Sequence, residues 1–253
     1  MSFDSTCRRL AEQFPQDFAS WILGKQVSLT ILDPTELSLE PIRADSLILL
    51  QGDDEILHIE FQVDPKKVVP FRLADYRLRL HRKLPQLTIR QIVIYLRQTN
   101  SPRVYQDTFE IAGMRAEFEI IRIWEVPAEE LLKFRGLLPF AALGKTDDPE
   151  QTLRDSVQAM KLIPDENQLH EALGAAYILS GLRLKPEVIS QIIRRDVMQE
   201  SATYQVILEE GRQEERNEIA INLLREGSTV AFIAKILGLS VETIAQLKRE
   251  NSL

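Results

Sequence analysis

The sequence predicts a mixed α/β first half and a nearly all-helical second half. Strand-like runs rich in leucine and β-branched residues lie between residues 43 and 124, with one helical segment among them. From about residue 149 onward, only helical periodicity is present. The 253 residues, 44% of them hydrophobic and 27% charged, are enough to bury a substantial core, which excludes a disordered or collagenous chain.

The N-terminal region is predicted to contain two short helices and an irregular segment. Apolar residues at helical spacing run through 5–23, and Pro15 divides the stretch because proline cannot continue a helix. Residues 27–43 contain two further prolines and are predicted to be extended or irregular. The runs RADSLILLQ and EILHIEFQV then flank Gly52 and Asp53, a pattern typical of a β-hairpin.

A helix and three more strands complete the predicted α/β region. Residues 71–84 begin directly after one proline and end directly before another, and they carry a helical pattern. Strands are predicted at 90–96, 105–111 and 115–124.

The second half is predicted to be helical. Helices are expected at 169–182, 186–199 and 209–226, and the chain ends with the helical segment STVAFIAKILGLSVETIAQLKRE. We therefore expect three parts: an α/β domain at 1–145, a helical region at 146–226 and a small helical hairpin at 227–253.

The composition of the chain indicates the compartment of the protein and the kind of metal site that it can form. No apolar run approaches the roughly 20 residues of a membrane span, and the N-terminus lacks the apolar core of a signal peptide, so we expect a cytoplasmic protein. One cysteine, Cys7, excludes an internal disulfide and a cysteine-based zinc cluster. Three scattered histidines also argue against a histidine-rich site. Any metal should therefore be held by oxygen ligands.

The charge of the chain is unevenly distributed. A net charge of −7 argues mildly against nucleic acid as a partner. The segment 66–103, however, carries ten basic residues against Asp75 alone. Such a patch can bind a polyanion although the whole chain is acidic. A basic but merely solvated helix face is the alternative.

The hairpin brings polar groups together in either of two registers. A two-residue turn at Gly52-Asp53 sets Asp45 opposite Glu60, whereas a four-residue loop sets Asp45 opposite Gln62. Alternation along the second strand puts His58, Glu60 and Gln62 on one face.

Facing carboxylates repel each other, and a cation between them would relieve the repulsion. Asp and Glu oxygens are the hard ligands that Mg²⁺, Mn²⁺ and Ca²⁺ prefer. A polar face that simply meets solvent explains the spacing of these residues equally well.

The helix at 71–84 is predicted to present a polar stripe and an apolar face. The residues expected to cover the sheet are Phe71, Ala74 and Leu78, with Leu73 and Leu80 nearby. The polar stripe consists of Arg72, Tyr76, Arg79 and Lys83. A basic, tyrosine-bearing helix beside a carboxylate pair suits a phosphate backbone near a metal.

These residues resemble the PD-(D/E)XK nuclease superfamily. The resemblance lies in Asp45, a short hairpin, Glu60-Phe-Gln62 and the helix PFRLADYRLRLHRK. More narrowly, the chain is similar to the bacterial recombination-promoting nuclease/putative transposase (Rpn) family. That similarity covers residues 1–125 closely and continues through LLPFAALGKTDDPEQTLR and RRDVMQESATYQVILEEGRQE. The resemblance implies an αβββαβ nuclease-like core, a central mixed sheet flanked by helices, followed by an all-α C-terminal region.

The resemblance also implies roles for individual residues. Asp45 and Glu60 match the metal ligands, and Gln62 stands where the superfamily usually has lysine. Glutamine can orient a water molecule but cannot stabilise negative charge as lysine does. Glu40 is the first candidate for the upstream acidic residue, ahead of Glu36 and Glu12. His58 lies on the same face and could assist.

The C-terminal segment is similar to a helix-turn-helix appended to recombinases. Its second helix, however, begins Val241-Glu242-Thr243, and its basic residues come late, whereas a recognition helix needs basic or amide residues at its start. We therefore favour a helical hairpin used for packing or self-association over a module that reads DNA sequence.

Together these features predict a metal-dependent DNA endonuclease-like enzyme linked to recombination or transposition. Asp45 and Glu60 would bind the metal, most simply Mg²⁺, with Mn²⁺ and Ca²⁺ as alternatives. Gln62 would orient water, and the polar stripe would hold phosphates. The rival prediction is a nuclease fold without turnover that acts as a DNA-binding or assembly factor. RNA remains a further substrate class, and a double-strand cut would call for two active sites, as in a homodimer.

Overall fold

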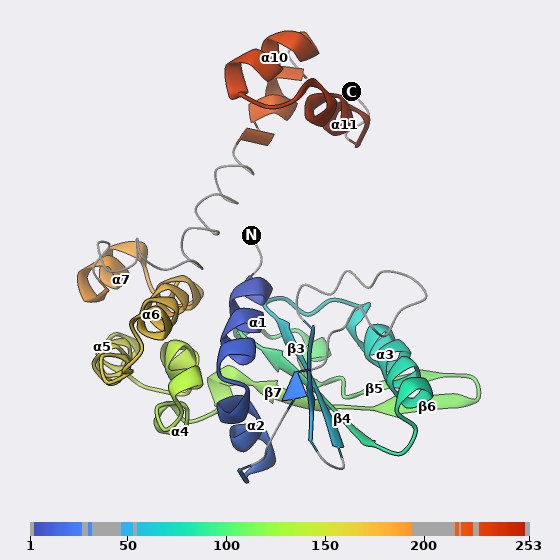
Figure 1. Ribbon diagram of the computed structural model, residues 1–253, viewed down its shortest axis with the longest axis vertical. Helices are drawn as coiled ribbons and strands as arrows, with labels where there is room; N and C mark the ends of the chain where they lie inside the picture. Colours follow the sequence, from blue (N-terminus) through green and yellow to red (C-terminus); the bar gives the residue numbers. More distant parts are fainter. Residues whose placement is uncertain are drawn as a thin grey trace. The chain divides into compact units, whose positions relative to one another are not determined.

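The structure is a computed structural model that describes most of the chain (Figure 1). The described residues are 3–26, 30–31, 47–52, 55–193, 216–217, 219–224 and 228–250. The chain divides between residues 203 and 204 into two compact units. The mixed α/β class predicted from the sequence is confirmed for the first unit, which contains a sheet with helices packed on both of its faces.

The sheet of the first unit has five strands in the order β1-β2-β3-β4-β7. The strands are β1 Thr30–Ile31, β2 Leu47–Gln51, β3 Glu55–Gln62, β4 Thr88–Tyr95 and β7 Glu119–Arg122. β2 is antiparallel to both β1 and β3, whereas β3, β4 and β7 run parallel to one another. The parallel strands β3 and β4 lie at the centre; β3 is buried after its first residue and β4 from Gln91 onward, as expected for strands covered on both faces.

Two helices at the N-terminus cover one face of the sheet. α1 spans Phe3–Gln13 and α2 spans Pro15–Leu23, so Pro15 begins the second helix as predicted. In Figure 1 both lie on the opposite side of the sheet from α3, which spans Val69–Lys83.

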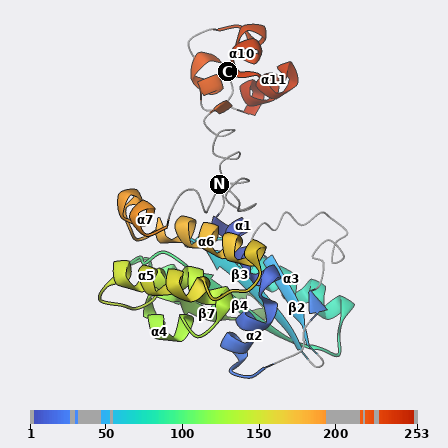
Figure 2. The same cartoon turned by 60° about the vertical axis from the view of Figure 1, so that its left-hand side comes forward.

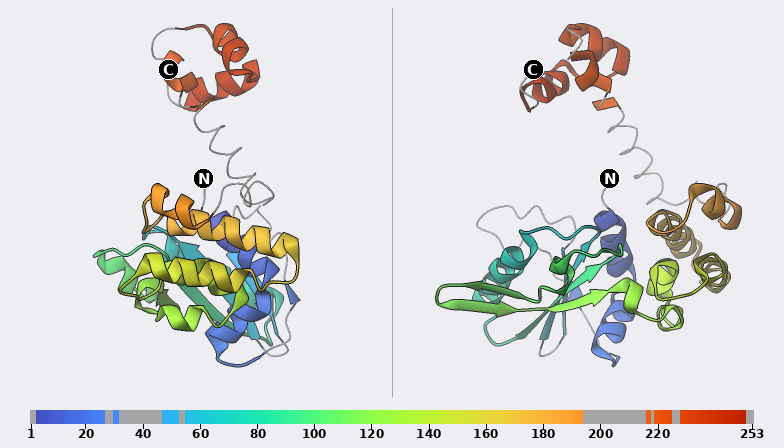
Figure 3. Two further views of the ribbon diagram at one scale, coloured as in Figure 1. Left: turned by 90° about the vertical axis from the view of Figure 1, so that its left-hand side faces the viewer. Right: turned by 180° about the vertical axis from the view of Figure 1, so that it is seen from behind.

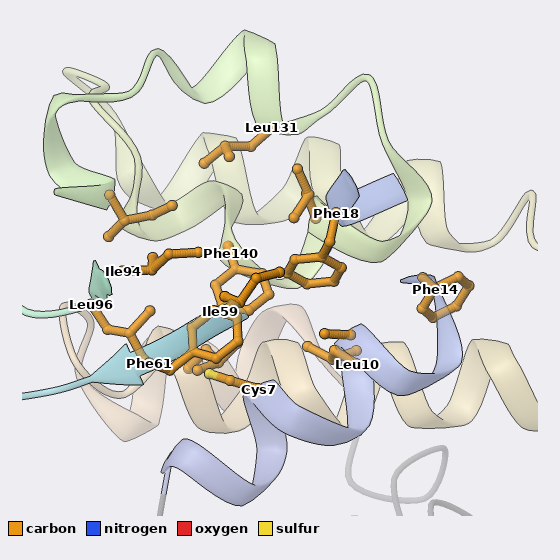
Figure 4. Packing of buried hydrophobic residues seen from close by; sticks show 14 of the residues in the cluster. Cys7, Leu10, Phe14, Phe18, Ile59, Phe61, Ile94, Leu96, Leu131 and Phe140 are labelled. Carbon is orange, nitrogen blue, oxygen red and sulfur yellow. The ribbon is translucent and has the colours of Figure 1, made fainter. Parts of the chain in front are cut away.

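The main core forms between this face and the segment that follows β7. Phe61 of β3 stacks on Phe140 with ring centroids 5.9 Å apart, and the edge of Phe18 from α2 meets both rings (Figure 4). Phe140 belongs to η4, Arg135–Leu143, a 3-10 segment in which every residue from Gly136 onward is buried. Aromatic contacts of this kind therefore tie the first helix pair, the sheet and η4 into one core.

α3 covers the other face and connects β3 to β4. The helix begins with a proline in its first turn and ends with His81, Arg82 and Lys83, whose positive charge suits a helix C-terminus. Leu73 and Leu80 face the sheet as predicted, but Phe71 and Leu78 do not and are exposed. Leu73 packs against Val93 and Tyr95 of β4, so the buried side of α3 lies roughly opposite Phe71.

The predicted strand at 115–124 is divided into two in the structure. β6, Met114–Glu117, pairs with β5, Thr108–Ile111, as a separate hairpin, while β7 joins the main sheet. Gly113 supplies the positive φ at the hairpin turn. Tyr105, the first residue of the predicted strand at 105–111, ends the short helix η2, Pro102–Tyr105, and the strand itself begins only at Thr108. The hairpin lies beside α3 (Figure 3).

Helices complete the first unit. They are α4 Ala128–Leu131, α5 Pro149–Met160, α6 Glu166–Ser180 and α7 Pro186–Ile192, with the short η3, Ile123–Glu125, ahead of them. α5 and α6 pack on η4 and on each other (Figure 2). Because Ala175 and Leu179 of α6 belong to the same core as Phe61, the boundary expected at 145/146 falls inside one compact unit.

The second unit contains a small helical cluster. α10 spans Val230–Leu237 and α11 spans Val241–Glu250, with Gly238 between them at φ 65°. Ile233 and Ile244 are buried together with Ala220 and Leu224 from the preceding segment. The C-terminal segment therefore forms two helices, and the second begins at Val241 as predicted. Among the described residues, no helix is long and apolar enough to cross a membrane.

Candidate functional site

The polar residues of β3 face α3 and are buried. His58, Glu60 and Gln62 alternate on one face as predicted, and none of the three is more than 2% exposed. The alternative of a polar face that meets solvent is therefore wrong, because α3 lies over it. Buried polar groups need hydrogen-bond partners, and these partners define the candidate site.

The β2–β3 register agrees with the longer of the two predicted loops. Leu47 pairs with Glu60 and Gln51 pairs with Ile56, so four residues separate the last paired positions of the two strands. The backbone N–H of Gly52 donates to the carbonyl oxygen of Glu55 at 2.8 Å. Asp45, which this loop length was predicted to set opposite Gln62, and Glu40, the upstream acidic candidate, lie outside the described residues.

Glu60 forms the centre of a polar cluster near the end of β3. Its Oε1 accepts a hydrogen bond from Gln62 Nε2 at 3.0 Å and forms an ion pair with the guanidinium of Arg72. Arg72 lies in the first turns of α3, which crosses this face of the sheet, and its side chain remains 29% exposed. The structure thus joins Glu60, Gln62 and Arg72, three of the predicted site residues, in one cluster.

A second polar chain lies deeper under α3. Arg77 Nε donates to Gln91 Oε1 at 2.7 Å, and Gln91 Nε2 lies 2.8 Å from both His58 Nδ1 and the carbonyl oxygen of Leu73. Because the amide nitrogen is the donor, His58 Nδ1 accepts and the proton of the neutral ring is on Nε2. Among the described residues, Nε2 has no hydrogen-bond partner.

Burial keeps His58 neutral. Loss of hydration, together with the positive charges of Arg72 and Arg77, lowers the pKa of His58 to about 3. His58 therefore serves as a neutral hydrogen-bond acceptor under this helix. The edge of its ring also meets Tyr76, with ring centroids 5.3 Å apart.

We expect His58 to make stability pH-dependent on the acidic side. In the unfolded chain His58 takes up a proton near pH 6.5, whereas the folded protein resists protonation down to about pH 3. The unfolded state therefore binds more protons in this window, and the free energy of unfolding falls as the pH drops, by up to about 1.4 kcal/mol per pH unit from this group. Urea unfolding of metal-free protein in EDTA, from pH 7 to pH 4, measures the slope.

His58→Asn is the matched comparison for this prediction. The Asn Oδ1 atom can replace Nδ1 as the acceptor from Gln91, but asparagine does not titrate. We expect the variant to have the shallower slope between pH 6.5 and pH 4. Equal slopes in the two proteins would show that His58 does not resist protonation in the folded state.

Two tyrosines near Glu60 are also buried. Burial raises the pKa of Tyr76 to about 12. Burial also raises the pKa of Tyr95, and the negative charge of Glu60 raises it further. Tyr76 was predicted to lie on the polar stripe of α3, but it packs with Ile56 and Leu80 at 3% exposure. The predicted position is wrong, because Tyr76 continues the helical spacing of Leu73 and Leu80 on the buried side of α3.

The remaining stripe residues lie on the outer surface of α3. Arg79 forms an ion pair with Asp75 one turn earlier, at 2.8 Å, and Lys83 is exposed at the end of the helix. Both remain candidates for phosphate contacts.

Sequence reasoning missed Gln91 and Arg77 as members of the cluster. Gln91 directly precedes the apolar residues of the run RQIVIYL, and a polar residue inside a buried strand was the available signal. Arg77 also lines a polar cavity of about 550 Å³ between the β5–β6 hairpin and the beginnings of β3, β4 and β7.

The described residues alone do not complete a metal site. They contribute one carboxylate, that of Glu60, and one amide, that of Gln62. No group of three or more His, Cys, Asp or Glu side chains that could hold a metal occurs within the described part of the chain. Metal binding here thus depends on Asp45 or Glu40 and stays a prediction.

Comparisons of the chain with protein-family models, curated proteins and solved structures gave no match.

Proposed function

We propose that this protein is a metal-dependent DNA endonuclease-like phosphodiester hydrolase that acts in recombination or transposition. The observation that carries the proposal is the buried Glu60 carboxylate beside the Gln62 amide, next to a helix rich in basic residues. The chain order also supports it, since α1 and α2, three strands, α3 and β4 follow one another as in the αβββαβ core that the resemblance implies.

The proposed roles follow the chemistry of the side chains. Asp45 and Glu60 are the metal ligands, and Glu40 is the further acidic candidate. A divalent ion, most simply Mg²⁺, would when bound lower the pKa of a water molecule and neutralise charge on the phosphodiester. Gln62 orients water, and Arg79 and Lys83 contact phosphates.

One observation favours a second candidate function, DNA binding without turnover. Arg72 forms its ion pair with the same oxygen of Glu60 that accepts from Gln62. A metal at Oε1 would have to compete with this guanidinium, and Gln62 supplies no positive charge in the place of the usual lysine.

Cleavage of supercoiled plasmid DNA separates the two functions. We expect nicking or linearisation with Mg²⁺ or Mn²⁺, no cleavage in EDTA, and none by an Asp45→Ala protein with an unchanged melting temperature. Cleavage that persists in a verified Asp45→Ala preparation would refute the assignment of the site. Absence of cleavage by folded wild-type protein with Mg²⁺, Mn²⁺ and Ca²⁺ would favour the non-catalytic binding function.

A further inference from the structure

The outer face of α3 carries exposed apolar side chains. Phe71 and Leu78 are 57% and 56% exposed and lie two turns apart on the same side of the helix. The edge of the Phe71 ring meets Phe109 of the β5–β6 hairpin, with ring centroids 5.7 Å apart. We call Phe71, Leu78 and Phe109 the apolar ridge.

A row of cations runs beside the apolar ridge. Arg72, Arg79 and Lys83 follow one another along the adjacent side of α3, at helical spacing. The segment 66–83 as a whole contains seven lysines and arginines against a single acidic residue, Asp75. Lys66 and Lys67, which precede the helix, and Arg82 near its end are also exposed. The apolar ridge is therefore flanked by a surface that attracts a polyanion.

This combination matches a polynucleotide strand whose bases are unpaired. In a duplex the bases are stacked inside and phosphates form the outer surface, so exposed phenyl rings beside cations have few apolar groups to contact. A single strand presents phosphates and base faces together, and proteins bind it with a basic track and aromatic side chains on which bases stack.

We propose that the apolar ridge and the cation row bind an unpaired strand of DNA or RNA and lead it toward Glu60. The inference rests on the proposed function for its polynucleotide substrate and specifies that substrate as unpaired. Arg72 begins the cation row and contacts Glu60, so a phosphate backbone that follows this row passes close to the candidate site.

Equilibrium binding in EDTA tests the proposal without any requirement for cleavage. Fluorescence anisotropy of the full chain would be measured with a labelled 20-nucleotide pyrimidine strand, as DNA and as RNA, and with a 20-base-pair DNA duplex. We expect tighter binding of the single strand. Phe71→Ala should weaken it about tenfold, as loss of one base–aromatic stack does, and Phe71→Trp should retain it.

Two further variants make the test specific. Phe71→Leu keeps an apolar side chain but no ring, and we expect it to bind as weakly as Phe71→Ala. Leu162→Ala changes a residue that is 79% exposed between α5 and α6, away from α3, and should bind like wild type. Melting temperatures would verify that the Phe71 variants are folded despite the loss of the Phe109 contact.

The outcomes separate this inference from the proposed function. Duplex binding as tight as single-strand binding, or wild-type affinity in Phe71→Leu, would overturn the inference and leave the nuclease proposal intact. Single-strand binding that depends on Phe71, without cleavage of any substrate, would support the inference and refute the catalytic function. Absence of binding to every probe would overturn the inference.

Discussion

A Glu60→Gln protein is expected to cleave supercoiled DNA about 100-fold more slowly than wild type, or not at all. Glutamine keeps the size of the side chain and can still accept hydrogen bonds from Arg72 and Gln62, so the packing under α3 should persist. It lacks the negative charge that a divalent cation requires from this ligand. Losing a few kcal/mol of transition-state stabilisation corresponds to the expected 100-fold reduction in rate. Initial rates of nicking at saturating Mg²⁺ measure the effect.

Glu55→Gln is the matched control for this experiment. Glu55 begins the same strand at its opposite end, where its carboxylate lies 3.9 Å from Lys25. Removing its charge should leave the cleavage rate unchanged. If Glu60→Gln and Glu55→Gln cleave equally fast, Glu60 is not a metal ligand, and the buried carboxylate has only a structural role.

Arg72→Met is expected to lower the free energy of unfolding by about 3 kcal/mol. The Glu60 carboxylate is 1% exposed and would lose the cation that compensates for its burial, a loss that is far more costly than that of a surface ion pair. Adding Glu60→Gln to this variant should recover much of the stability, because the buried negative charge is then removed as well. Urea unfolding of the two variants and of wild type measures both effects.

Arg79→Met provides the comparison on the same helix. Arg79 pairs with Asp75, whose side chain is 36% exposed, and such a pair contributes about 0 to 1 kcal/mol. Equal losses in Arg72→Met and Arg79→Met would mean that the Glu60–Arg72 pair contributes no more than a surface pair. This result does not depend on whether the protein cleaves DNA, so it tests the geometry of the site alone.

Much of the secondary structure followed from local patterns. Pro15 separates α1 from α2 as expected, the two runs around Gly52 form β2 and β3, and the prolines at 70 and 85 delimit α3 to within two residues. Such signals act on the backbone within a few residues, so they can be predicted directly from the local sequence. The shared face of His58, Glu60 and Gln62 also followed, because alternation along a strand is a local property.

Other features depended on how elements pack together. Helical spacing grouped Tyr76 with the arginines of α3, but the distribution of apolar and charged residues around this helix did not show which side meets the sheet. The run at 115–124 is continuous in sequence, yet its first part pairs with β5 and its second part with β4. Which strand each part pairs with depends on residues far away in the chain, and strand propensity does not predict it.

By itself the sequence determined the alternation of helices and strands, the buried-strand character of β4 and the accumulation of positive charge on α3. Tertiary structure alone decided that α3 lies over the polar face of β3, that Arg72 pairs with Glu60, and that Gln91 and Arg77 join His58. The physical reason is that a buried polar group must find its partner wherever packing brings one close, and here those partners come from residues 12 to 33 positions away in the chain. Packing also decided that Phe71 is exposed, because the opposite side of α3 contacts the sheet.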